Sequence, residues 1–229
     1  WLSRAPALLK EAFKKWRNTY KYYPLANAHI NHASHHAAWI AKKFHKPVLY
    51  TPNPVTDIEI PPPPKAMQKL AQPARFLLLG GLQGIATLSG LYFFADKVLP
   101  LLRKDILEKK LEIRLIGRDK LVGRLATQLR DAGVIECGFV ANLADEMEKA
   151  TAMLVPTEMT LGIRTRILDA FRYRLAVIAH RSNQAGFPEL QHDHNCLISD
   201  GAQDFASQMK YLAENPEEAV KIGEQAYSD

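Results

Sequence analysis

One segment of the sequence combines a glycine with two arginines in a pattern that could bind an anion. Gly162 precedes Arg164 and Arg166 where an apolar stretch gives way to a predicted helix at 164–173. A glycine at such a turn lets a ligand approach the backbone, and the free N–H groups of a helix's first turn attract anions. Residues two apart lie on different helix faces, so we expect one arginine to point into the site and the other to brace it.

A carboxylate follows in the same predicted helix. Asp169 lies three residues after Arg166, about one turn deeper, where it could accept two hydrogen bonds from a ribose diol. The alternative is an ion pair between these two side chains on a solvated helix, an arrangement that is common and weak. Their spacing alone is compatible with both interpretations.

The elements that must position these residues alternate between strand and helix. Strands are expected at 75–79, 111–116, 134–138, 153–155 and 176–179, and helices at 88–104, 122–132, 142–150, 164–173, 204–214 and 216–227. This alternation predicts an α/β fold, a Rossmann-like doubly wound parallel sheet with helices on both faces. Ligands of such sheets bind beyond the carboxyl ends of the strands. The candidates at that edge are Gly80, Gly81, Arg118 and Glu158, together with the Gly162 segment.

The first sixty residues have a different character. Helices are expected at 1–20 and 28–44, followed by a short strand at 47–50. The run Pro61–Pro64 favours polyproline II, because each proline lacks an N–H group and has a fixed φ angle. We place a domain boundary there, with an incomplete helical and strand remnant at 1–60 and the Rossmann-like domain at 61–229. The chain begins at Trp1 without the features of a signal peptide, which favours a fragment or a processed product.

Composition sets broad limits on function. A chain that is 47% hydrophobic and 24% charged is typical of a globular protein. Its apolar runs are shorter than the roughly 20 residues that cross a bilayer, so no transmembrane helix is expected. The net charge of +6 favours an anionic partner. Cys137 and Cys196 have no CxxC spacing, so we expect neither a disulfide framework nor a zinc site. A reducing compartment is therefore expected.

Several short motifs together resemble a known family. The segment 162–170, GIRTRILDA, resembles the G-x-R-x-K-x-x-E-A segment of retaining glycosyltransferase family 4. Further segments are similar to motifs of that family in the same order, namely 28–55, 77–80, 113–118, 138–140 and 184–188. The resemblance implies the C-terminal, donor-binding domain of a GT-B glycosyltransferase, preceded by the tail of its N-terminal acceptor domain.

The resemblance also implies an activity and roles for residues. The expected reaction transfers a sugar, with retention, from a nucleotide-diphosphate-sugar co-substrate to a saccharide or lipid-linked acceptor of surface polysaccharide or glycolipid synthesis. Arg164 and Arg166 match the basic residues of the motif and would neutralise the departing diphosphate, while Asp169 takes the position of a ribose-binding glutamate. The remaining donor-binding candidates are Gly80, Gly81, Arg118, Glu158 and Gly162. No metal ion or other cofactor is expected, and the location is cytoplasmic, with the basic N-terminal helix able to contact the inner face of a membrane.

Two other functions stay open. Met159, Thr160 and Leu161 stand where the family has a glycine-rich turn, which favours a catalytically degenerate binding or scaffolding module. The hypothesis of a nucleic-acid-binding domain rests on the net charge and on the tyrosines beside Lys21. Burial of Tyr20, Tyr22 and Tyr23 against a sheet is the favoured interpretation, so no nucleic-acid partner is expected.

The histidines suggest two further sites. Histidines 29, 32, 35 and 36 could share a helix face and bind a metal, but acidic and cysteine ligands are missing nearby, so a packing helix is favoured. Histidines 180, 192 and 194 fall in predicted loops near the anion site. Capping of the backbone is favoured there over binding of phosphate.

Overall fold

The computed structural model describes residues 5–53 and 73–229, which fall into two compact units, Trp1–Pro52 and Asn53–Asp229. The predicted boundary after residue 60 and the proline run at 61–64 lie outside the described residues.

The smaller unit contains the helices α1 (Ala5–Tyr22) and α2 (Ser34–Phe44), the short 3-10 helix η2 (Tyr23–Leu25), and the strands β1 (His29–Asn31) and β2 (Val48–Tyr50). The two strands pair in parallel, and α2 packs against both. The predicted helix over 28–44 is therefore wrong in its first part. The side chain of Asn31 accepts a hydrogen bond from the N–H of Ala33 at 2.9 Å, and this local turn separates β1 from α2.

The larger unit is built on a six-stranded parallel sheet. Its strands are β3 (Ala74–Leu79), β4 (Leu111–Ile116), β5 (Ile135–Gly138), β6 (Ala152–Val155), β7 (Ala176–His180) and β8 (Leu197–Ser199). They lie in the order β5-β4-β3-β6-β7-β8, which is the doubly wound arrangement, with β3 and β6 at the point where the strand order reverses. The predicted Rossmann-like fold is confirmed. The sixth strand, β8, was not predicted, because three residues carry too little pattern to stand out.

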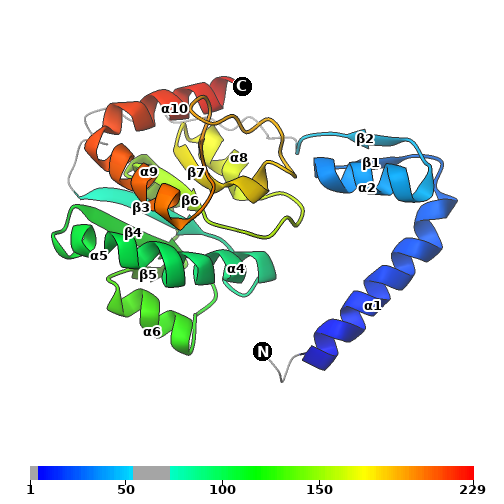
Figure 1. Cartoon of the computed structure of the whole chain (residues 1–229), viewed down its shortest axis with the longest axis horizontal. Helices are drawn as coiled ribbons and strands as arrows, with labels where there is room; N and C mark the ends of the chain where they lie inside the picture. Colours follow the sequence, from blue (N-terminus) through cyan, green and yellow to red (C-terminus); the bar gives the residue numbers. More distant parts are fainter. Residues whose placement is uncertain (1–4, 54–72) are drawn as a thin grey trace. The chain divides into compact units, whose positions relative to one another are not determined.

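Helices cover both faces of this sheet (Figure 1). They are α4 (Ile85–Phe93), α5 (Leu99–Leu107), α6 (Arg124–Asp131), α7 (Leu143–Glu148), α8 (Thr165–Arg172), α9 (Ala202–Glu214) and α10 (Pro216–Ser228). Alternate residues of β3 point to opposite faces, so Phe76 and Leu78 pack with α4, α5 and α9, while Leu77 packs with α7 and α8. The apolar strands thus anchor two cores, as expected of a sheet buried on both faces.

The helical path from Ile85 to Leu107 contains one wide turn. A π-helical segment, Phe94–Val98, joins α4 to α5 just before Pro100. Proline has no N–H to donate and its ring crowds the carbonyl four residues earlier, and the wide turn accommodates both effects within a continuous path. Among the described helices this one alone is long and apolar enough to cross a bilayer by length and composition. Its Phe94, Val98 and Leu102 are fully buried in the core of the sheet.

Candidate functional site

The candidate site lies where β3 and β6 end and α8 begins. Gly80 directly follows β3, and its φ of +147° is strained for any residue with a side chain. A Cβ atom on Gly80 would lie 2.6 Å from Nη1 of Arg166. The missing side chain therefore leaves the space that the Arg166 guanidinium occupies.

Arg166 is a cation held at this edge without a counter-ion. Nη1 donates a hydrogen bond to the carbonyl oxygen of Leu79, and Nη2 donates one to Oγ1 of Thr157 at 3.3 Å. Nε is buried without a hydrogen-bond partner, and no carboxylate of the described residues forms an ion pair with Arg166. Burial, reinforced by the charge of Arg164, lowers the pKa of Arg166 to about 10. A desolvated, unpaired charge at a strand edge is the arrangement that an anionic ligand would relieve.

Arg164 adds a second positive charge at the start of α8. It is the N-cap residue of that helix and is partly buried, and burial lowers its pKa. Within the described part of the chain its guanidinium forms no hydrogen bond or ion pair. Gly162, with a φ of +58°, turns the chain into this helix. The first turn of α8 and two guanidinium groups therefore offer positive potential in one place, which suits a diphosphate.

Asp169 stands apart from both arginines. It forms no ion pair with Arg166, so the solvated i,i+3 pair considered from the sequence is not formed. The side chain is partly buried, and burial raises its pKa while the nearby Arg172 opposes that rise. No hydrogen bond to its carboxylate is found among the described residues. The carboxylate is therefore available to accept hydrogen bonds from a hydroxylated ligand.

Glu158, the fourth charged candidate, forms an ion pair with a lysine. Its Oε1 lies 3.2 Å from Nζ of Lys97, which the π-helical turn carries. Nζ of Lys97 also lies over the ring of Phe93, 5.2 Å from its centre. Both members of the pair are partly solvent-exposed, so it contributes little to stability.

A cleft of about 570 Å³ opens beside Gly80 and Gly81, at the ends of β3 and β4. Arg118 and Phe139 line it, with the guanidinium carbon 5.0 Å from the centre of the ring. Phe139 is 64% exposed, although an aromatic side chain is usually covered. A cleft of this size with a largely exposed aromatic side chain can take a planar base. The sequence indicated Arg118 but not Phe139, whose signal was an aromatic residue directly after a strand.

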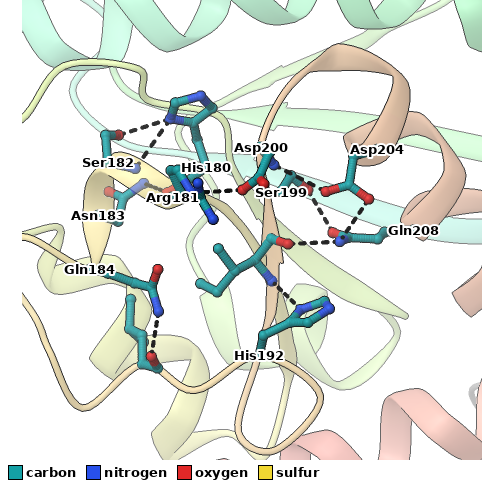
Figure 2. A network of polar contacts seen from close by, with 12 residues as sticks. His180, Arg181, Ser182, Asn183, Gln184, His192, Ser199, Asp200, Asp204 and Gln208 are labelled. Atoms are coloured by element: carbon teal, nitrogen blue, oxygen red, sulfur yellow. Dashed lines mark hydrogen bonds and ion pairs between the residues drawn. The ribbon is translucent and has the colours of Figure 1, made fainter.

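Figure 2 shows the hydrogen bonds of the loop after β7, including the contacts of His180 with Ser182 and Asn183, and two further bonds tie this loop to the loop after β6. Ser182 Oγ donates to the carbonyl oxygen of Thr157, and Nδ2 of Asn183 contacts the same oxygen at 3.4 Å. Asn183 also donates to the carbonyl oxygen of His180 at 2.8 Å. Thr157 is fully buried and accepts from Arg166, so the network holds the residue that aims the guanidinium. Sequence reasoning missed Thr157, Ser182 and Asn183.

The loop histidines bond to the backbone. Nδ1 of His180 accepts from the N–H of Ser182 at 3.3 Å and caps the short helix at 181–183. Nδ1 of His192 accepts from the N–H of Ile198 at 3.0 Å. The expected capping role is confirmed for these two. His194 instead lies 3.3 Å from a carboxylate oxygen of Asp229.

Acidification is expected to weaken the larger unit through His180. Burial lowers the pKa of His180 below its ordinary value of 6.5, so the unfolded chain takes up the proton first. The contribution to stability is present above about pH 6.5 and is lost as the pH falls through that value toward the lower folded pKa. His180→Asn keeps an acceptor near Nδ1 but does not titrate. In urea titrations between about pH 7 and pH 5, the wild type should lose more unfolding free energy than the variant. Parallel profiles would contradict this.

Two histidines of the smaller unit contact backbone carbonyl oxygens of the same unit. Nε2 of His29 contacts the carbonyl oxygen of Tyr23 at 3.1 Å, and Nδ1 of His32 contacts that of Thr51 at 3.0 Å. His29 lies on β1 and not on a helix, so the expected common helix face does not form. No group of three or more metal-ligating side chains is found in residues 5–53 and 73–229.

Comparison with known proteins agrees with this geometry. Residues 73–215, more than half of the chain, match the family model described as "Glycosyl transferases group 1". No curated protein shows a significant sequence match. Among solved structures, TarM has a TM-score of 0.73 at 14% identity, over 94% of this chain and 42% of its own. HepE of Anabaena, in complex with UDP and glucose, has a TM-score of 0.66 at 16% identity, with 89% and 58% covered.

Sucrose-phosphate synthase of Thermosynechococcus elongatus is similar to the same extent, with a TM-score of 0.69 at 14% identity over 89% of this chain and 53% of its own. The chain thus spans about half the length of these structures. At such identities the likeness shows the fold, and the family model shows the relationship. The chain therefore belongs to the group 1 glycosyl transferases, and its doubly wound unit has the Rossmann-like fold of GT-B domains.

Proposed function

We propose that the larger unit binds a nucleotide-diphosphate-sugar and serves as the donor half of a transferase. The acceptor is a saccharide or lipid-linked saccharide of surface polysaccharide or glycolipid synthesis. The observation that carries this proposal is the desolvated Arg166 guanidinium, which no carboxylate of the described residues neutralises. A diphosphate at the start of α8 would supply the missing negative charge.

The groups along this edge suit the parts of such a donor. Arg164 and Arg166 face the diphosphate, Asp169 accepts hydrogen bonds from the ribose, and Phe139 stacks on the base. As the sugar leaves, negative charge grows on the diphosphate, and fixed guanidinium groups stabilise that charge in the transition state. With a pKa of about 10, Arg166 keeps its charge at neutral pH. The complex of HepE with UDP and glucose makes UDP the first nucleotide to test.

The finer features of the reaction and its location are part of the proposal. Retention of anomeric configuration, without a metal ion or other cofactor, follows from the resemblance of residues 162–170 to family 4. A cytoplasmic location at the inner face of a membrane is supported by α1. Its Lys10, Lys14, Arg17 and Lys21 recur at spacings of four, three and four, which places them along one side of the helix. Such a basic stripe attracts anionic head groups.

A binding or scaffolding module without catalysis is the second candidate. Met159 and Leu161 are 38% and 40% exposed in the loop between β6 and α8. Their side chains stand where the family motif leaves bare backbone. A module of this kind could bind a nucleotide without transferring the sugar, so binding and turnover must be measured separately.

The test is a calorimetric titration with UDP, GDP, ADP and TDP, followed by the corresponding nucleotide-sugars. Binding of at least one nucleotide, with release of nucleotide from its sugar conjugate on addition of acceptor, is the result expected of a transferase. Binding without release favours the scaffolding module. If none of the four nucleotides binds, the proposed donor site is wrong.

Removing the ring of Phe139 is expected to weaken nucleotide binding about tenfold, because stacking of a base on an aromatic ring contributes roughly 1–3 kcal/mol. Phe139→Ala should keep its unfolding free energy, since the ring is mostly exposed. Leu107→Ala, which truncates a side chain that is 73% exposed, is the control. The affinity is read by calorimetry for the nucleotide and for ribose 5-phosphate. An equal loss for both ligands would contradict a base-stacking role.

A further inference from the structure

Exposed aromatic side chains occur in both units of the chain. In the smaller unit, the prediction that the tyrosines are buried is wrong for Tyr20 and Tyr22, which are both exposed. In the larger unit, the 64% exposed side chain of Phe139 lines the cleft of about 570 Å³ at the ends of β3 and β4. An aromatic side chain exposed in a cleft indicates a ligand with a flat face, and the charges beside it indicate which one.

Two opposite charges line this cleft without pairing with each other. Arg118 and Asp119 are its charged lining residues. The guanidinium carbon of Arg118 lies 5.0 Å from the centre of the Phe139 ring. Asp119 is only partly exposed, and among the described residues its carboxylate forms no hydrogen bond and no ion pair. A charge that is partly removed from water without a partner gains from a ligand that supplies one.

The position of Asp119 on the sheet edge places it away from the diphosphate. The Arg166 guanidinium donates to the last residue of β3, whereas Asp119 follows β4 and Phe139 follows β5. In the strand order β5-β4-β3-β6 these two residues therefore follow strands that are one and two positions from β3, at about 5 Å per position. A carboxylate repels phosphate groups. Asp119 therefore suits a part of a nucleotide that offers hydrogen-bond donors, and the neighbouring aromatic ring makes that part the base.

The bases differ in the donors that they offer to a carboxylate. Guanine has two neighbouring donors, N1–H and the 2-amino group, and its acceptors O6 and N7 suit a guanidinium. The N3–H of uracil and thymine lies between two carbonyl oxygens that repel a carboxylate, and adenine offers only its 6-amino group. One anion and one cation in the same cleft therefore match guanine best.

We propose that this cleft binds a guanine base, so that the donor is a GDP-sugar. Asp119 accepts hydrogen bonds from N1–H and the 2-amino group, and Arg118 donates to O6. The inference rests on the proposed function and adds the identity of the base to it. The cleft has room for a bicyclic purine, because a Cβ atom on its lining residue Gly81 would meet no atom within 4 Å. A uridine nucleotide would place carbonyl oxygens against the carboxylate, which is the source of the selection.

The experiment is a calorimetric titration of the full chain with GDP, UDP, ADP and TDP, and with inosine and xanthosine diphosphates. GDP should bind about tenfold more tightly than UDP, and inosine diphosphate, which lacks the 2-amino group, should lie between them. Asp119→Asn should lose about tenfold in affinity for GDP. The same variant should gain affinity for xanthosine diphosphate, because xanthine has a carbonyl oxygen in place of the 2-amino group and the asparagine amide donates to it.

Asp131→Asn is the matched control. Asp131 is exposed at the end of α6 and does not line the cleft, so this variant makes the same change in charge and should keep the affinities of the wild type. Urea unfolding of both variants checks that the isosteric replacement leaves the fold intact. The comparison of GDP with inosine diphosphate in the wild type tests the 2-amino contact without any substitution.

The outcomes separate this inference from the proposed donor site. Equal affinities of the wild type for the four nucleotides would overturn the selection of guanine and leave the donor site standing. A preference for GDP that persists in Asp119→Asn would overturn the role of this carboxylate. An equal loss for all four nucleotides in that variant would place Asp119 at the ribose, which also overturns the inference. If no nucleotide binds, the donor site is wrong and the selection of guanine fails with it.

Discussion

Arg166→Met is expected to make the ligand-free protein more stable and to abolish its binding of nucleotide diphosphates. The pKa of Arg166 falls from 12.5 to about 10 because its charge is buried. This shift corresponds to a destabilisation of the folded state by roughly 3 kcal/mol at most, and by less where solvent reaches the side chain. Methionine forgoes two hydrogen bonds of about 1 kcal/mol each, so the net gain in unfolding free energy is about 1 kcal/mol. Affinity should fall at least about 100-fold, since two charge-assisted hydrogen bonds to phosphate are lost.

Arg103→Met is the matched control. Arg103 lies exposed on α5 and forms no ion pair among the described residues, so this variant makes the same chemical change and the same change in net charge. Urea unfolding and calorimetry on the two variants separate the local effect from the loss of one charge. A destabilised Arg166→Met protein would show that the guanidinium is a structural brace. Equal nucleotide affinities in wild type and Arg166→Met would show that the diphosphate does not bind at this edge of the sheet.

The sheet of the larger unit was predictable because several of its strands contain short, uninterrupted apolar runs. Phe76 to Leu78 and Ala152 to Val155 are buried from both faces, and such runs between helical patterns indicate a parallel sheet. The errors arose where the decisive contact is not local in the sequence. His29 to Asn31 read as part of a helix because their preference is weak, and pairing with Val48 to Tyr50 makes them a strand. Leu197 to Ser199 become a strand through pairing with β7.

The same distinction applies to the candidate site. Gly162 and Arg166 were predictable because a glycine before a helix start and a basic first turn are features of one short segment. Thr157, Ser182 and Asn183 were not, because their roles depend on hydrogen bonds between the loops after β6 and β7. The contact of Gly80 with Arg166 spans 86 positions of the chain and leaves no local pattern. Local sequence thus indicated the candidate anion-binding groups, and long-range packing determines how their side chains are placed.

Gly80→Ala is expected to damage both the fold and the donor site. The φ of +147° is strained for alanine, which should cost about 1–3 kcal/mol of unfolding free energy. The added Cβ would also lie 2.6 Å from Nη1 of Arg166, so the guanidinium must move away from the carbonyl oxygen of Leu79. Nucleotide affinity should therefore fall about tenfold or more, since a charged hydrogen-bonding group is displaced. Chemical denaturation and calorimetry report the two effects separately.

Gly81→Ala is the control for that change, because a Cβ on Gly81 meets no atom within 4 Å and its φ is not in the left-handed region. Its unfolding free energy should stay close to that of the wild type. The double variant Gly80→Ala, Arg166→Met then divides the cost of Gly80→Ala into its two causes. With the guanidinium absent, only the backbone strain remains, so the alanine should destabilise the methionine background less than it destabilises the wild type. If the two penalties are equal, the steric contact with Arg166 plays no part, and Gly80 is required for its backbone conformation alone.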